Sequence, residues 1–189
     1  VVDKAKVIDG KSIEPGDVVL GIPSNGLQTN GYSLARKLFF EVGNYKVDTF
    51  VDELGTTVGE ALLATHQSFL PQIGPLLETE AGADKSGRVP LFKGLAHITG
   101  GGFLENIPRI LPEGVSVEIN RGTWPELPIF GMMQRLGNVS DYEMFRTFNM
   151  GIGMVVFCTE DDLARVRTQI PLCSEIGRAL DGEKEVLFK

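Results

Sequence analysis

Three glycine-containing segments of this 189-residue chain carry the side chains whose types and spacing could do chemistry. The first, GIPSNGLQTNGYSLARK (21–37), is a polar loop between an apolar run and a helical pattern. Free N–H groups and the macrodipole at a helix start favour an anion, and glycines allow close approach to the backbone. The candidate ligands in this loop are Ser24, Asn25, Gly26, Thr29, Asn30 and Gly31, with charge available from Arg36 and Lys37. A capped turn uses the same residue types, so both interpretations stay open here.

The second segment, AHITGGG (96–102), places His97 at the end of an expected strand, beside Gly100, Gly101 and Gly102. Functional sites of α/β proteins gather at the carboxyl ends of strands. The alternative is a structural histidine followed by a flexible turn. The only histidines are His66 and His97, and they are not spaced as an HxxxH pair, so no zinc site is predicted.

The third segment, RTFNMGIGMVV (146–156), has Gly151 and Gly153 inside an apolar strand pattern. Glycines there imply the close approach of another backbone or of a ligand. The segment does not match GxGxxG, and the chain has neither a Walker A motif nor a GxSxG elbow. The residues alone therefore indicate loops suited to phosphate and one placed histidine, without a complete catalytic set.

Composition places the chain among ordinary globular proteins, with 42% apolar and 23% charged residues. The net charge of −7 argues against a nucleic-acid or anionic-membrane partner, and no apolar run approaches the ~20 residues that span a bilayer. Cys158 and Cys173 are too few for a disulfide framework, so reduced thiols and a cytoplasmic location are expected. The start at Val1, without methionine, is typical of a fragment of a longer protein.

The elements that must position these segments alternate along the chain. Strands are expected at 1–7, 17–22, 95–99, 115–120 and 150–158, with two more around the Asp181-Gly182 turn. Helices are expected at 31–43, with Asn30 as N-cap and Gly43 as stop, and at 56–70 (capped by Thr56 or Thr57), 71–81, 103–111, 128–136, 141–145 (capped by Ser140) and 161–170. A loop is expected at 81–90. This alternation predicts a single α/β (α+β) layered domain, in which helices cover a mixed sheet.

Four segments together resemble one family: GDVVLGIPSNGLQTNGYSLARK, GLAHITGGGFLENIPRILP, WPELPIFGMMQ and MFRTFNMGIGMV. They are similar to the carboxyl-terminal domain of aminoimidazole ribonucleotide synthetase, also called phosphoribosylformylglycinamidine cyclo-ligase. The segments occur in the family's order from about Asp9 to Val156. Single motifs are shared with selenophosphate synthetase, thiamin-monophosphate kinase, the hydrogenase-maturation dehydratase and formylglycinamidine ribonucleotide synthetase.

The resemblance implies an enzyme of purine biosynthesis that uses ATP to close the imidazole ring of formylglycinamidine ribonucleotide. It implies that residues 1–189 form the substrate-side domain, and that ATP and Mg²⁺ bind mainly to an amino-terminal domain absent from this chain. The isolated chain is then expected to be inactive, and the longer protein to be a homodimer. Two alternatives remain: a domain of a related ATP-using enzyme, and a non-catalytic domain that binds a phosphate ligand.

The resemblance also assigns roles to residues of this chain. It places the substrate phosphate or ribose at the loop of Ser24, Asn25, Gly26, Gln28, Thr29, Asn30 and Gly31. It makes His97 the candidate for contacting the reacting amidine, with Gly100, Gly101, Gly102, Asn149 and Gly151 lining the cleft, and it implies no metal ligand in this chain. Gln28 departs from the pattern, because many members have a histidine there. Glutamine forms hydrogen bonds but does not shuttle protons near pH 7.

Overall fold

The computed structural model describes residues 7–81 and 91–189. The expected strand at 1–7 and the expected loop at 81–90 lie outside these ranges, apart from Val7 and Ala81.

A six-stranded sheet forms the centre of the described structure, in the order β4-β6-β1-β7-β5-β8. All neighbouring strands run antiparallel except β5 and β8, which are parallel. The strands are β1 (Val18–Pro23), β4 (Gly94–His97), β5 (Val115–Ile119), β6 (Ile152–Cys158), β7 (Ser174–Asp181) and β8 (Val186–Phe188). The predicted mixed sheet is therefore confirmed.

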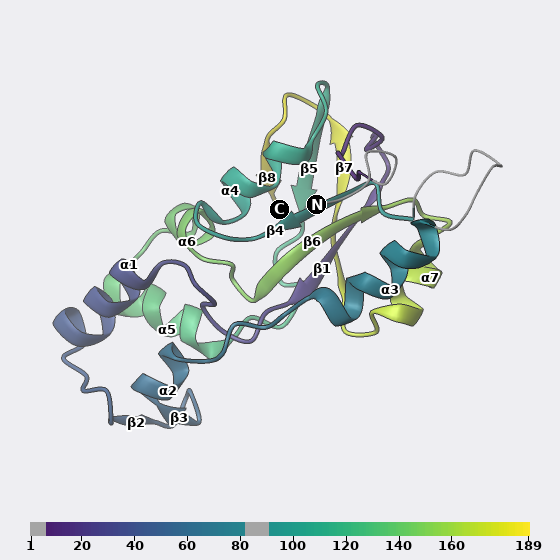
Figure 1. The fold of residues 1–189 in the computed structure, drawn as a ribbon. Coiled ribbons are helices and arrows are strands. Elements are labelled where there is room, and N and C mark those ends of the chain that lie inside the picture. Colours follow the sequence, from purple (N-terminus) through teal and green to yellow (C-terminus); the bar gives the residue numbers. More distant parts are fainter. Residues whose placement is uncertain (1–6, 82–90) are drawn as a thin grey trace.

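Helices cover both faces of this sheet (Figure 1). Along β1, Val18 and Leu20 belong to the apolar core beneath α3 and α7, whereas Val19 belongs to the core on the other face. Successive side chains of a strand point to opposite faces, which explains why the central strands read as continuous apolar runs. The helices are α1 (Tyr32–Arg36), a π-helical turn (Lys37–Val42), α2 (Val58–Leu62), α3 (Leu70–Ala81), α4 (Gly102–Asn106), a 3₁₀ turn (Pro108–Ile110), α5 (Pro128–Gly137), α6 (Asp141–Thr147) and α7 (Leu163–Gln169).

One buried ion cluster ties the start of β1 to the segment before β4. Lys93 Nζ lies 2.7 Å from both Asp17 Oδ1 and Glu14 Oε1. The side chains of Lys93 and Asp17 are only 3% and 4% exposed, whereas Glu14 is at the surface. Loss of one partner would leave an uncompensated buried charge, so the cluster fixes these two segments to each other.

The expected helix over 56–70 is wrong. Residues Thr56–Thr57 form strand β3, which pairs with β2 (Phe50–Val51), and the helix that follows ends at Leu62. Thr57 caps this helix through a capping box with Glu60, as the sequence suggested for Thr56 or Thr57. Residues 63–69 are not helical, and α3 begins at Leu70. Proline is tolerated in a first helical turn, so Pro71 lies within the start of α3 instead of breaking a longer helix.

The two carboxyl-terminal strands are present, but no hairpin joins them. After β7, Gly182 N donates to Gly114 O and Lys184 N donates to Val115 O, so the chain passes over the start of β5. It then runs beside β5 as β8, parallel to it, with Val117 opposite Val186. β5 therefore lies between the two strands that the Asp-Gly signal suggested as neighbours.

The remaining predicted elements are present with shifted ends. Ser140 caps α6 by accepting from Glu143 N, and Gly43 ends the π-helical turn that extends α1. Helix α4 gives way to a 3₁₀ turn at Pro108, whose missing N–H cannot continue an α-helix. In residues 7–81 and 91–189 no helix has the length and apolar character needed to cross a bilayer.

Candidate active site

Hydrogen bonds join two of the sequence-predicted loops. Ser24 Oγ lies 2.9 Å from Asn149 Oδ1, and Asn149 Nδ2 donates to Gly26 O at 2.9 Å. Gly151 N also donates to Asn149 Oδ1, and Ser24 N donates to Gly151 O. Ser24 and Asn149 are buried, and these bonds give them a role in holding the loop after β1 against the loop before β6. Their contact with a ligand stays a prediction.

A second group of predicted site residues has buried polar atoms without partners. Among the described residues, the buried side-chain atoms that lack a hydrogen bond are Gln28 Nε2, Gln28 Oε1, Asn30 Nδ2 and His97 Nε2. Burying an unpaired polar group costs roughly 1–3 kcal/mol, so natural proteins rarely leave such groups without a purpose. All of these atoms come from three residues that the sequence placed in one site.

Gln28 also has a strained backbone. Its φ is 59°, in the left-handed region that a non-glycine residue rarely adopts, and its side chain is 3% exposed. Its amide lies over Gly153, where a Cβ would fall 2.8 Å from Gln28 Nε2 and 2.3 Å from Phe69 Cζ. Two side chains, and not the expected second backbone, therefore lie close to Gly153.

The prediction that Asn30 caps α1 is wrong. Gly31 is the N-cap residue, with a φ of 75°, and no side chain caps this helix. Residue 31 must also be small, because a Cβ there would lie 2.3 Å from Phe148 Cε1. The side chain of Asn30 instead approaches Gly100, with Oδ1 at 3.7 Å from a Cβ built there. A left-handed glycine cap thus frees the Asn30 amide for the site.

The three consecutive glycines have different structural roles. Gly101 and Gly102 both have positive φ, and a Cβ at Gly102 would lie 2.0 Å from Phe145 O of α6. Asn106 fixes the turn by donating to the carbonyl oxygens of Gly100 and Gly102. Gly100 alone has open space above it, apart from the nearby Asn30 side chain.

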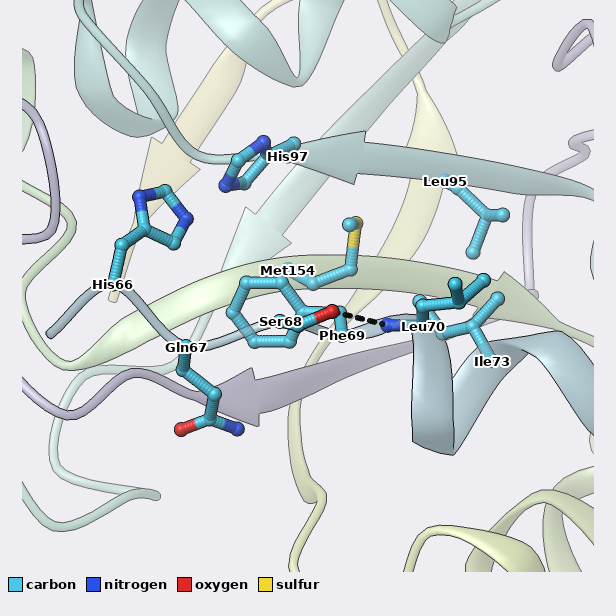
Figure 2. A pocket seen from close by; sticks show the side chains of 9 residues that line it. All are labelled: His66, Gln67, Ser68, Phe69, Leu70, Ile73, Leu95, His97 and Met154. Carbon is cyan, nitrogen blue, oxygen red and sulfur yellow. Dashed lines mark hydrogen bonds between the residues drawn. The ribbon is translucent and has the colours of Figure 1, made fainter.

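His97, the last residue of β4, lies at one end of a cavity of about 480 Å³ (Figure 2). Its ring packs edge-on against Phe69, with centroids 5.7 Å apart, and against His66, with centroids 5.4 Å apart. Burial lowers the pKa of His97, and the nearby His66 lowers it further, so His97 is neutral at pH 7. The cavity is lined by His66, Gln67, Ser68, Phe69, Leu70, Ile73, Leu95, His97 and Met154.

Sequence reasoning missed His66 and Phe69, because it placed both inside one long helix. In the structure they belong to the non-helical segment 63–69, which the first loop holds in place. Asn25 Nδ2 donates to Thr65 O at 2.7 Å, and Thr29 Oγ1 lies 3.5 Å from His66 Nδ1. Pro71 was the available signal, since a proline near a helix start would have placed these residues in the preceding loop.

The site offers neutral hydrogen-bonding groups. Arg36 and Lys37 are exposed, and none of the described residues that line the cavity is an aspartate, glutamate, lysine or arginine. Mg²⁺ prefers carboxylate oxygens, and in the described part of the chain no three histidine, cysteine or acidic side chains gather to hold a metal. The donor set therefore suits an uncharged polar group such as an amide or an unprotonated amidine, and any phosphate here would depend on backbone N–H groups.

Comparison with known proteins gives relatives over the whole chain. A phosphoribosylformylglycinamidine cyclo-ligase of Alkaliphilus oremlandii (strain OhILAs) is 44% identical over 192 residues, covering 100% of this chain and 53% of its own length. The chain thus spans about half the length of the curated relatives it matches.

Solved structures support the fold at lower identity. The thiamine-monophosphate kinase of Stenotrophomonas maltophilia K279a has a TM-score of 0.57 at 14% identity, over 100% of this chain and 54% of its own. The hydrogenase maturation protein HypE, solved in complex with ATP, has a TM-score of 0.54 at 13% identity, over 95% of this chain and 49% of its own. Residues 14–189 match the family described as AIR synthase related protein, C-terminal domain, and the chain belongs to that family.

Proposed function

We propose that this chain is the substrate-side domain of a phosphoribosylformylglycinamidine cyclo-ligase. In the longer protein it would bind formylglycinamidine ribonucleotide while the ring of aminoimidazole ribonucleotide closes. Support comes from the cyclo-ligase relative at 44% identity and from the four motifs in the family's order.

One observation carries the proposal to particular residues: the unpartnered buried atoms of Gln28, Asn30 and His97. A substrate amide or amidine presents donors and acceptors side by side, so it would satisfy these atoms together. The loop from Ser24 to Gly31 would then bind the phosphate or ribose through backbone N–H groups. Gly100 has room for a ligand beside Asn30.

His97 is proposed as the group that takes up a proton. When the amidine-side nitrogen bonds to the formyl carbon, phosphate leaves with the former formyl oxygen and the nitrogen loses one proton. A neutral imidazole can accept that proton, and the lowered pKa of His97 keeps it neutral at pH 7. Gln28 cannot take this role, because an amide does not titrate in this range.

ATP would supply the phosphoryl group that makes the formyl oxygen a leaving group. We assign ATP and Mg²⁺ mainly to the part of the longer protein outside this chain, because the donor set described above does not fit Mg²⁺. The ATP complex of HypE, which shares this fold, is in keeping with a nucleotide-using relative. We also propose that the longer protein is a homodimer and that its location is cytoplasmic.

The test uses the longer protein and measures ATP-dependent formation of aminoimidazole ribonucleotide. We expect His97→Gln to lower kcat/KM by roughly 10²–10⁴-fold, the usual contribution of a general acid or base. The isolated chain should form no product, although it should retain weak affinity for a phosphoribosyl ligand. Gln28→His tests whether an added titrating group changes the pH profile.

A matched control is Gln169→Asn, an exposed position on α7, which should leave the rate unchanged. Turnover by the isolated chain, or full activity of His97→Gln with an unchanged pH profile, would contradict the assignment.

A further inference from the structure

The two histidines of this chain meet at one end of the cavity. His66 comes from the segment before α3 and His97 from the end of β4, and their rings lie edge to face with centroids 5.4 Å apart. Figure 2 shows both rings together, away from the aliphatic end formed by Leu70, Ile73 and Leu95. Residues far apart in sequence and on different elements thus form one pair.

Several contacts hold His66 in place. The Asn25 amide holds the carbonyl of Thr65, the residue immediately before His66, at 2.7 Å. Thr29 Oγ1 lies 3.5 Å from His66 Nδ1, and Phe69 packs against His97 with ring centroids 5.7 Å apart. The His97 ring is therefore in contact with His66 and Phe69, and both neighbours come from the same segment.

The described residues that line the cavity include no ionisable side chain other than those of the two histidines. The cavity is lined by the segment 66–69, by Leu70 and Ile73 of α3, by Leu95 of β4 and by Met154 of β6, and only the two histidines can take up a proton. Two imidazolium rings at this separation repel each other strongly in a partly buried site. Of the side chains that line the cavity, only the His66 imidazole is ionisable and also in ring contact with His97.

We propose that His66 is a positioning residue that limits the pair to one proton, so that His97 stays neutral and ready to accept a proton from the ligand nitrogen. This rests on the proposed function, in which His97 is the proton acceptor. In the reaction the proton moves from the nitrogen to His97 Nε2, which has no hydrogen-bond partner within residues 7–81 and 91–189. His66 acts through its ring contact and through the repulsion that a second proton on the pair would meet, and it forms no bond with the reacting atoms.

The first test follows the protonation of His97 by NMR in this chain, for wild type, His66→Gln and His66→Asn. Removing the neighbouring imidazole should raise the titration midpoint of His97 by about half a pH unit or more, a threefold change in its proton affinity. Gln67→Asn, which lines the same cavity without a titrating group, should leave the midpoint unchanged. An unchanged His97 midpoint in the two folded His66 variants overturns the inference.

The second test is the pH dependence of kcat/KM in the longer protein. A base with a raised pKa becomes protonated at a higher pH. His66→Gln should therefore shift the fall of kcat/KM on the acidic side of the profile to higher pH. The variant should therefore lose activity at pH 6 and approach the wild-type rate at pH 8. An NMR midpoint that rises while this fall of kcat/KM stays in place supports the pair and contradicts the role of His97 as the base, so the two proposals fail separately.

Discussion

Gln28 is 3% exposed, has a φ of 59°, and neither of its amide atoms has a partner among the described residues. Each of these features lowers the stability of the folded chain. They occur together in a residue that faces Gly153 and Phe69, beside His97. A position that is unfavourable for folding and well placed for a ligand is typical of a functional site.

At this scale we expect Gln28→Met to stabilise the isolated chain and to weaken ligand binding. Methionine has a similar volume and removes the unpaired amide, so the free energy of unfolding should rise by about 1 kcal/mol. Urea unfolding measures this change, and kcat/KM of the longer protein should fall. Gln169→Met, at an exposed position on α7, is the matched control and should change neither quantity. A less stable Gln28→Met chain would show that the amide is satisfied in the folded state.

At the scale of elements, the turn between β4 and α4 separates a packing glycine from a site glycine. Gly102 meets the Phe145 carbonyl of α6, whereas the nearest atom to a Cβ on Gly100 is Asn30 Oδ1. The same residue type therefore serves helix packing at one position and access to the site at the other.

We expect Gly102→Ala to lower stability and Gly100→Ala to lower activity. Gly102→Ala adds a methyl group where a backbone oxygen lies and where φ is positive, so the free energy of unfolding should fall by about 2 kcal/mol or more. Gly100→Ala should change it by less than about 0.5 kcal/mol, because no atom lies closer than 3.7 Å. Urea unfolding and kcat/KM of the longer protein separate the effects, since only Gly100→Ala should lower kcat/KM in a stable protein. Equal losses of stability at both positions would contradict this division.

At the scale of the whole molecule, the last strand completes the core on one face of the sheet. The Phe188 ring lies 4.4 Å from that of Phe145 and 6.2 Å from that of Phe103, whereas Leu187 points outward and is 42% exposed. Lys189 N donates to Ile119 O, which fastens the end of the chain to β5.

We therefore expect Phe188→Ala to lower the free energy of unfolding by about 2 kcal/mol, and Leu187→Ala by less than about 0.5 kcal/mol. Both apolar cores should lose stability together in Phe188→Ala, because β1 and β6 contribute side chains to each core. Fluorescence of Trp124 reports one core and labelling of Cys158 reports the other, since burial raises the pKa of that thiol to about 12 and protects it in the folded chain. Different midpoints for the two probes would show that the cores unfold separately.

The sequence by itself determined the features that depend on neighbours along the chain. Apolar runs marked β1 and β6, Thr57 and Ser140 marked helix starts, and the glycine clusters marked the turns of the site. Periodicity and capping are local effects, which is why these predictions are confirmed. The four motifs also carried the family, because the matched residues lie in sequence order.

Only the tertiary structure decided which polar groups are satisfied and which meet. Ser24 and Asn149 bond to each other, whereas Gln28, Asn30 and His97 keep unpartnered atoms. Gly31, and not Asn30, is the N-cap of α1, and β5 lies between β7 and β8 in the sheet. Helix α2 ends at Leu62, so His66 lies outside it and contacts His97. Hydrogen-bond partners and ring contacts depend on segments distant in sequence, and no local pattern records the distances between them.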